Sequence, residues 1–311
     1  DAGWATRRDG RLTDRFRRRV IIPVRDQHRQ IIGAYGRDIT DTAAQKYLNT
    51  ADTIAFRKGA ALYRPAATAL DAHATVTICE GSLDALAIAA HAAAVGKSRY
   101  YGPVSPSGTA LTDTQGRIAL ALGDRPPLVC ADSDEPGQAA AEKWVRLLMS
   151  HGRETLVTVL PHGHDPASWL NEHGPAGLRA FTRTGCLDLP AETVKPVPAG
   201  ALLAERTLTK HITLARRRDP DTETVTVLAD VIRELATESA KLPGREPAQR
   251  FAAAAGDVLA RRADGMDAAG RTRQVIDAIT RAAPKHQPGI GPQSFSAAGD
   301  SPVTEQEIAI K

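Results

Sequence analysis

The stretch Thr77-Ile78-Cys79-Glu80-Gly81 ends one apolar run of this chain, and Ala131-Asp132-Ser133-Asp134 ends another about fifty residues later. Carboxylates at the ends of buried strands repel one another and are costly to remove from water, so they are tolerated mainly where a cation compensates them. Carboxylate oxygens suit hard cations, and this part of the chain has neither paired cysteines nor well-spaced histidines for zinc. The two stretches therefore predict a metal site for Mg²⁺ or Mn²⁺, without zinc.

The segments around these stretches alternate between strand and helix patterns. We expect strands at residues 76–78, 99–104, 128–130 and 156–160, and helices at residues 83–95, 112–122 and 138–150. Strands that alternate with helices indicate parallel pairing through right-handed crossovers, hence an α/β sheet with helices on both faces. Ligands of such sheets bind beyond the carboxyl ends of the strands. Glu80, Asp132 and Asp165 are all expected at that edge.

Composition limits the classes of protein that this chain can be. It has 311 residues, of which 42% are hydrophobic, enough for two domains with proper cores. The net charge is only +4, but residues 1–64 carry fourteen Lys and Arg against seven acids. That local surplus is typical of a surface that binds phosphates. Three widely spaced cysteines disfavour a disulfide framework, and no apolar run is long enough to span a membrane. We expect a cytoplasmic protein.

The domain organisation is predicted from changes in pattern. A basic mixed α+β subdomain covers residues 1–72, truncated at its start because the opening residues read as mid-domain sequence. It contains a hairpin of residues 20–24 and 31–35 around a polar turn, and an Ala-rich helix that begins in residues 65–72. Residues 73–186 form the α/β metal-binding domain, and residues 187–200 form a proline-punctuated linker. An all-α unit follows at residues 201–283, and residues 284–311 are too polar to bury a core and are expected to be disordered.

The motifs resemble those of a known family. Glu80-Gly81, Asp132-Ser133-Asp134 and the GQAA of residues 137–140 resemble the Toprim domain, the α/β metal site shared by bacterial primases, topoisomerases and several nucleases. The basic region narrows the resemblance. Its series RFRRRVIIPVRD (15–26), GAYGR (33–37), KYLNT (46–50) and FRK (56–58) is similar to the RNA-polymerase core of bacterial DnaG-type primases, in the same order. The similarity covers about residues 1–185, and the flanks fit a phage, plasmid or other mobile-element relative as well as a host enzyme.

The resemblance implies an activity and a set of site residues. A primase of this type synthesises RNA primers from NTPs on single-stranded DNA by metal-dependent nucleotidyl transfer. Asp132 and Asp134 are expected as direct metal ligands, with Asp165 adding a carboxylate from the next loop. Two roles are open to Glu80, metal ligand or general base. Asp84, one helical turn after Glu80, is expected to face the same pocket.

The basic subdomain is expected to bind nucleotide and template. The family's residues that bind nucleotide phosphates and template are matched here by Arg37, Lys46, Asn49 and Lys58. Tyr47 is a candidate stacking partner for a base. Arg15 and Arg19 from the first basic run complete the predicted binding set. Single-stranded DNA and NTPs are therefore the expected partners, with a replicative helicase or an upstream zinc-binding region as further ones, in a nucleoid-associated protein.

Two other readings stay open on the sequence. The first is a Toprim phosphodiesterase, either a nuclease or a topoisomerase fragment. The second is a non-catalytic nucleic-acid-binding Toprim module that has lost full metal binding. One departure from the family bears on this choice, because many relatives have a second Asp where this chain has Ala167. That departure weakens one predicted metal position.

Overall fold

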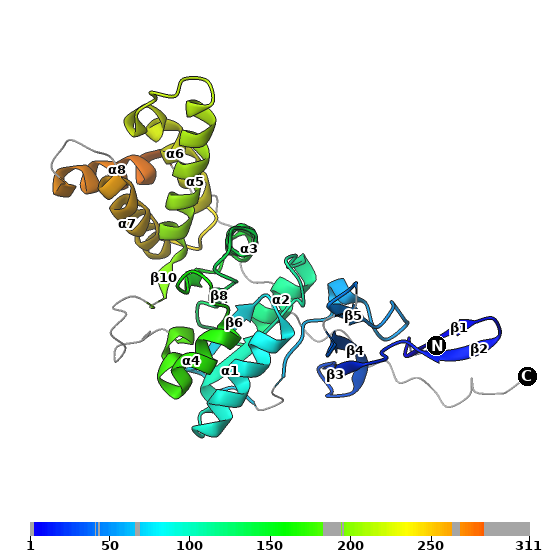
Figure 1. Cartoon of the computed structure of the whole chain (residues 1–311). Coiled ribbons are helices and arrows are strands. Elements are labelled where there is room, and N and C mark those ends of the chain that lie inside the picture. The colour runs from blue at the N-terminus through cyan, green and yellow to red at the C-terminus, as the bar shows by residue number, and fades with distance from the viewer. Residues whose placement is uncertain are drawn as a thin grey trace, which may run out of the picture.

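The structure, a computed structural model, describes residues 3–40, 42, 44–65, 69–182, 194, 196–262 and 268–282. Three regions follow one another along the chain, as Figure 1 shows: two small N-terminal sheets, a central α/β sheet, and a unit of four helices on the other side of it. Most of the predicted linker and all of the predicted disordered tail, residues 284–311, lie outside the described residues.

The N-terminal region is built from two antiparallel sheets. Strands β1 (Ala5–Arg8) and β2 (Arg11–Asp14) form a hairpin around Asp9 and Gly10, whose φ angles of 50° and 79° are those of a two-residue hairpin turn. Strands β3 (Arg19–Arg25), β4 (Ile31–Asp38) and β5 (Tyr47–Asn49) form the second sheet in the order β3-β4-β5. The predicted hairpin of residues 20–24 and 31–35 is confirmed, since Ile22 pairs with Tyr35 in the β3–β4 register.

The central sheet has the strand order β10-β9-β8-β6-β7. Strand β6 (Thr75–Cys79) lies between β7 (Tyr101–Val104) and β8 (Leu128–Cys130) and pairs with both in parallel. Strand β9 (Leu156–Val157) continues the parallel set, and β10 (Val197–Pro198) adds an antiparallel edge. The predicted parallel pairing of the α/β sheet is confirmed.

Helices cover both faces of this sheet because its strands alternate between two cores. Ile78 and Val129 point to the face covered by α2 (Asp113–Ala121) and α3 (Glu135–Ser150). Cys79 and Cys130 point to the opposite face, covered by α1 (Ser82–Ala94) and α4 (Pro166–Gly177). Burial on both faces explains why all five residues of β6 are buried.

Two local predictions differ from the structure. The helix expected to begin in residues 65–72 is wrong for the described part of that stretch, because Pro65 and residues 69–72 are not helical. Asp71 instead makes a turn, in which its carboxylate accepts a hydrogen bond from the His73 amide and its carbonyl from the Ala74 amide. The strand expected from residue 99 starts at Tyr101, since Ser98–Tyr100 forms a 3-10 turn, η2.

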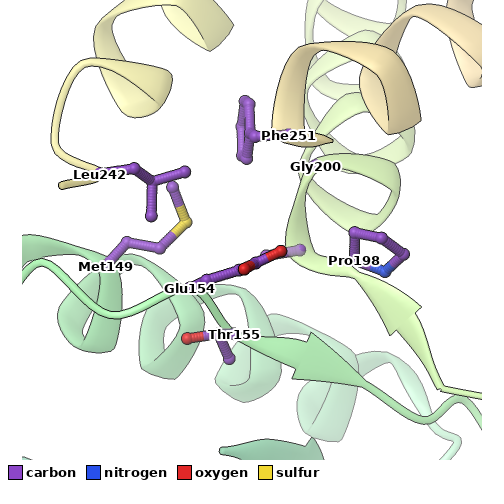
Figure 2. A pocket seen from close by; sticks show the side chains of 8 residues that line it. Met149, Glu154, Thr155, Pro198, Gly200, Leu242 and Phe251 are labelled. Carbon is purple, nitrogen blue, oxygen red and sulfur yellow. The ribbon is translucent and has the colours of Figure 1, made fainter. Parts of the chain in front are cut away.

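The described part of the last region consists of four helices: α5 (Ala199–Arg216), α6 (Thr224–Ser239), α7 (Arg245–Arg262) and α8 (Ala268–Ala282). Their packing against the sheet region is tight. Figure 2 shows the junction, where Met149 and Thr155 face Leu242 and Phe251 around a cavity of only about 10 Å³. At Gly200 a Cβ atom would lie 2.3 Å from the Phe251 carbonyl oxygen, so only glycine allows α5 to approach α7 this closely.

Ion pairs also cross this junction. Arg146 of α3 pairs with Glu142 on its own helix at 3.0 Å, and with Glu234 and Glu238 of α6 at 3.1 and 2.6 Å. Arg206 of α5 donates to both carboxylate oxygens of Glu135, at 2.8 and 3.0 Å. The helical unit is thus joined to α3 by compensated charges as well as by apolar packing.

No helix among the described residues is long and apolar enough to cross a membrane.

Candidate active site

The carboxylates of the two acidic stretches, residues 77–81 and 131–134, lie where the strand order of the central sheet reverses. From β6 the chain crosses to β7 on one side and then returns to β8 on the other. Such a switch point leaves a crevice at the carboxyl ends of the strands, where ligands bind in α/β sheets. Glu80 follows β6 directly, and Asp132 lies two residues after the end of β8.

Asp84 is held in this crevice by backbone amides. It lies in the first turn of α1, where its Oδ2 accepts a hydrogen bond from Gly81 N at 3.0 Å. Its other oxygen, Oδ1, accepts from Ala167 N of α4 at 3.2 Å. The Asp84 side chain, only 7% exposed, therefore ties the β6–α1 turn to the loop that carries Asp165.

The Asp132-to-Asp134 loop is fixed by the residues that follow it. Asp134 caps α3, with its Oδ1 accepting from Gly137 N at 2.8 Å. A Cβ atom at Gly137 would lie 2.4 Å from the Asp132 carbonyl oxygen, and the Gln138 side chain donates to that same oxygen at 2.9 Å. The glycine and glutamine of the motif thus hold the Asp132 backbone in place.

The third acidic loop is linked to the second. Asp165 caps α4, with its Oδ1 accepting from Ser168 N at 2.6 Å. The His164 carbonyl accepts from Ser133 N at 3.2 Å. A backbone hydrogen bond therefore joins the loops after β8 and β9.

Cations of the N-terminal region face these carboxylates across a pocket of about 490 Å³. The cationic wall comes from β4, β5 and the short 3-10 helix η1 (Lys58–Ala60), and the acidic wall from the loops after β6, β8 and β9. Arg37 donates to the Tyr47 hydroxyl at 2.7 Å, and its guanidinium lies 5.2 Å from the ring centroid of Tyr47. The predicted residues that line the pocket are Arg37, Lys46, Tyr47, Asn49, Lys58, Glu80, Asp84, Asp132 and Asp165.

Three predicted residues do not line the pocket. Asp134 lies beside it and uses one oxygen to cap α3. Arg15 donates to the Asn49 carbonyl at 3.1 Å, and Arg19 donates to the carbonyls of Gly36, Lys46 and Gln45. These two arginines hold β5 and the backbone of Lys46 in position.

Other residues line the pocket without having been in the predicted set. Tyr35, Ser107, Gly108 and Ser168 contribute to its walls. Ser107 has a φ of 56°, and the amide of Gly108 donates to the Glu80 carbonyl at 3.2 Å. The sequence signal was present for this loop, because Ser107-Gly108 is a turn pair, but its contact with Glu80 is a property of the fold.

The electrostatics of the acidic wall favour protonation or a bound cation. Burial, with the charges of Asp132 and Asp134, raises the pKa of Glu80 to about 7. Burial, with the charges of Asp165 and Asp132, raises the pKa of Asp84 to about 7. Burial, with the charges of Asp165 and Asp134, raises the pKa of Asp132 to about 6, although Lys46 acts in the opposite direction.

Among the described residues, no group of three or more His, Cys, Asp or Glu side chains is arranged to hold a metal ion by itself. The pocket still fits a divalent cation that is shared with a ligand. Glu80 Oε2 and Asp132 Oδ1 are buried and have no hydrogen-bond partner within the described part of the chain. Mg²⁺ is typically bound by one or two carboxylates together with substrate phosphates rather than by an all-protein cage. Glu80 and Asp132 have the chemistry for the protein side of such a site.

Comparison with protein families finds two matches along the chain. Residues 1–68 match the N-terminal domain of the DNA primase catalytic core, and residues 77–170 match a Toprim-like domain. The pocket lies between these two matched segments.

DNA primases are also found among the curated proteins and the solved structures that resemble this chain. The chain is 33% identical to a DNA primase of Deinococcus radiodurans over 173 residues, which are 55% of this chain and 29% of that protein. It is 31% identical to a DNA primase of Aquifex aeolicus over 172 residues, 55% of this chain and 33% of that protein. The chain thus spans about a third of the length of these relatives.

Among solved structures, a DNA primase domain from Pseudomonas aeruginosa matches with a TM-score of 0.61 at 24% identity, covering 89% of this chain and 78% of that one. A DnaG primase catalytic domain bound to ssDNA matches with a TM-score of 0.60 at 23% identity, covering 86% and 76%. At these identities the two structures establish the shared fold.

Proposed function

Since the chain belongs to the bacterial DnaG-type primase family, we propose that it synthesises RNA primers from NTPs on a single-stranded DNA template. The observation that carries this proposal is the pocket itself. It sets Arg37, Lys46 and Lys58 opposite Glu80, Asp84 and Asp132. A nucleoside triphosphate needs both walls, cations for its phosphates and carboxylates for the divalent ions that accompany it.

The residues divide the work of nucleotidyl transfer. Mg²⁺ or Mn²⁺ at Glu80 and Asp132 supplies, when bound, neutralisation of the triphosphate and activation of the attacking 3′-hydroxyl. Lys46, whose charge already acts on Asp132, and Lys58 bind phosphate oxygens. Asp134 and Asp165 position the acidic loops through their helix caps and add negative charge to the site.

Glu80 also fits the role of a general base. An acid whose pKa lies near the working pH exchanges protons effectively, and the pKa of Glu80 is raised to about 7 by burial and by Asp132 and Asp134. Asp84 has a similar pKa but both its oxygens accept backbone hydrogen bonds. We therefore assign Asp84 a positioning role and Glu80 the proton-accepting or metal-binding one.

Single-stranded DNA is the proposed template. One structural relative is described as bound to ssDNA, which supports this choice. Tyr47, 37% exposed and stacked against Arg37, offers a ring for an unpaired base, while Asn49 and Lys58 line the same wall. A replicative helicase, an upstream zinc-binding region and a nucleoid-associated location are proposed on family resemblance alone.

The alternatives have less support. The N-terminal 68 residues match the N-terminal domain of a primase core, which a Toprim nuclease or topoisomerase has no reason to carry. A non-catalytic module would not need an acidic wall whose carboxylates have raised pKa values, set opposite three cations.

The test is incorporation of labelled NTPs on single-stranded DNA with Mg²⁺ or Mn²⁺ as the added ion. We expect short RNA products that depend on template, NTPs and metal. Binding of single strands without incorporation under either ion would favour the non-catalytic module, and template cleavage would favour the nuclease.

A further inference from the structure

A second cleft, of about 880 Å³, lies between the N-terminal region and the α/β sheet. It shares no lining residue with the active-site pocket, yet the two are close neighbours along one segment. Lys58 lines the pocket, while Ala60 at the other end of the same 3-10 helix lines the cleft. A ligand that fills both would pass over this segment.

One wall of the cleft is basic. Arg25 ends β3, Arg29 lies in the turn between β3 and β4, and Arg64 comes from the segment that leads into the sheet region. Arg25 donates to the Arg29 carbonyl at 2.8 Å, which fixes the turn with both side chains exposed. Burial lowers the pKa of Arg64, so this guanidinium is partly withdrawn from water.

The acid within this wall does not neutralise it fully. Asp26 is the acidic residue among those that line the cleft, and its Oδ1 accepts from the amides of His28 and Gln30. Its carboxylate is therefore occupied in shaping the turn. The two exposed arginines, Arg25 and Arg29, outnumber this one acid and leave the turn with positive charge.

The opposite wall is apolar. Ile118 of α2, Leu122 at the C-terminal cap of that helix and Val104 at the end of β7 line it. Ile118 is 38% exposed, so part of its aliphatic side chain is open to solvent in the cleft. A ligand with phosphates along one side and flat, weakly polar surfaces along the other would match both walls.

We infer that this cleft is a second binding site for single-stranded nucleic acid, which holds the part of the template that lies outside the active-site pocket. The inference rests on the proposed function. Phosphates contact Arg25, Arg29 and Arg64, and bases lie against Ile118 and Leu122. A free nucleotide fits less well, since sites for small ligands bury most of the ligand surface, whereas Arg25, Arg29 and Ile118 all stay exposed.

The test compares two strand lengths by fluorescence anisotropy. A strand of about 4 nucleotides can occupy the active-site pocket alone, whereas one of about 16 nucleotides can reach the cleft as well. The variant is Arg25→Ala/Arg29→Ala, and the matched control is Arg217→Ala/Arg218→Ala, two exposed arginines beyond the sheet region. Thermal unfolding of both variants checks that the fold is intact.

For the long strand we expect the log–log salt dependence of binding to become shallower by about 1.4, or about 0.7 for each lost phosphate contact. The short strand and the control variant should show the parent slope. Ile118→Glu places a negative charge in the cleft, which repels the phosphates, and leaves all the arginines in place. This variant should weaken binding of the long strand only.

Three outcomes would overturn the inference: an unchanged long-strand slope, equal losses for both lengths, or a loss confined to binding of free ATP. The measurement needs no catalysis. A chain that binds long strands through the cleft but incorporates no NTP would therefore refute the proposed function and leave this inference standing.

Discussion

Two groups of partly buried charges lie along α3, and they are built in opposite ways. Near the start of the helix, Glu80, Asp84 and Asp132 gather at the sheet edge beside Asp134. Farther along, Glu142, Glu234 and Glu238 surround Arg146. We call these the open acidic site and the closed ion cluster. Both collect carboxylates, but only the closed cluster has a cation at its centre.

Their pKa values follow from this difference. At Glu234 burial acts to raise the pKa, but a hydrogen bond to His211 and the charges of Lys210 and Arg146 outweigh it and leave the pKa lowered. At Asp84 burial and the charges of Asp165 and Asp132 act together, and the pKa rises to about 7. Crowded carboxylates are therefore structural where the fold supplies the cation and functional where a ligand must supply it.

The largest expected effect is on catalysis at the open site. Asp132→Asn keeps the shape of the side chain but removes its charge, and we expect metal-dependent NTP incorporation to fall by about 10³-fold, as on loss of a group that stabilises charge in the transition state. Asp230→Asn, at an exposed ion pair with Arg233, is the control and should keep parental activity. Parental activity in the Asp132 variant would place the reaction elsewhere.

Disrupting the closed cluster should lower the free energy of unfolding rather than the rate of NTP incorporation. Arg146→Met removes the shared cation and leaves Glu238, only 6% exposed, without that partner. Removing one member of such a pair costs about 3 kcal/mol of unfolding free energy, measured by urea denaturation. The double variant Arg146→Met/Glu238→Gln should recover part of it. If the double variant were less stable than the single one, the comparison would fail.

The pH dependence of stability should separate the two groups further. The folded pKa of Asp84 is about 7, above its unfolded value, so the metal-free folded protein binds more protons than the unfolded chain between about pH 4 and 7. Its contribution to the unfolding free energy must fall as the pH rises through that window, by on the order of 2 kcal/mol. Asp84→Asn should flatten the curve relative to the parent, measured by urea titration at pH 5 and 7.5 without metal. A parallel pair of curves would contradict the assignment.

The smallest effect concerns the cations that face the open site. Neutralising Arg37, Lys46 and Lys58 together removes two or three phosphate contacts, so the salt slope of single-strand binding should fall by about 0.7 per contact. Anisotropy titrations over a salt series measure it. An unchanged slope would mean that the template is held by other residues, for example on the helical unit.

Sequence patterns located the open site better than the closed one. Glu80, Asp132 and Asp165 could be placed at one edge because an apolar strand and a following helix pattern flank each loop, and the carboxyl ends of parallel strands meet. For Arg146 the sequence reveals only the partner at i−4, Glu142, because Glu234 and Glu238 lie on a helix whose docking depends on packing at Gly200 and Leu242.

The misses have local causes. The β1–β2 hairpin was not predicted although Asp9-Gly10 is a hairpin turn pair, because the flanking strands carry arginines instead of an alternating apolar pattern. The expected helix in residues 65–72 gave too much weight to alanine content and too little to the turn-forming Asp71. For Arg15 and Arg19 a sequence does not show that the side chain turns back to its own sheet, and their contact with phosphate stays a prediction.

The ion pairs that cross from α3 to the helical unit set a rule for building chimeras. A graft that exchanges residues 199–282 between relatives would separate Arg146 from Glu234 and Glu238, and Arg206 from Glu135. The graft should therefore include α3 of the donor together with the donor's helical unit. Because Asp134 caps the start of α3, such a graft also imports the foreign loop that shapes the acidic edge. The helical unit and the acidic edge of the sheet therefore cannot be exchanged independently of each other.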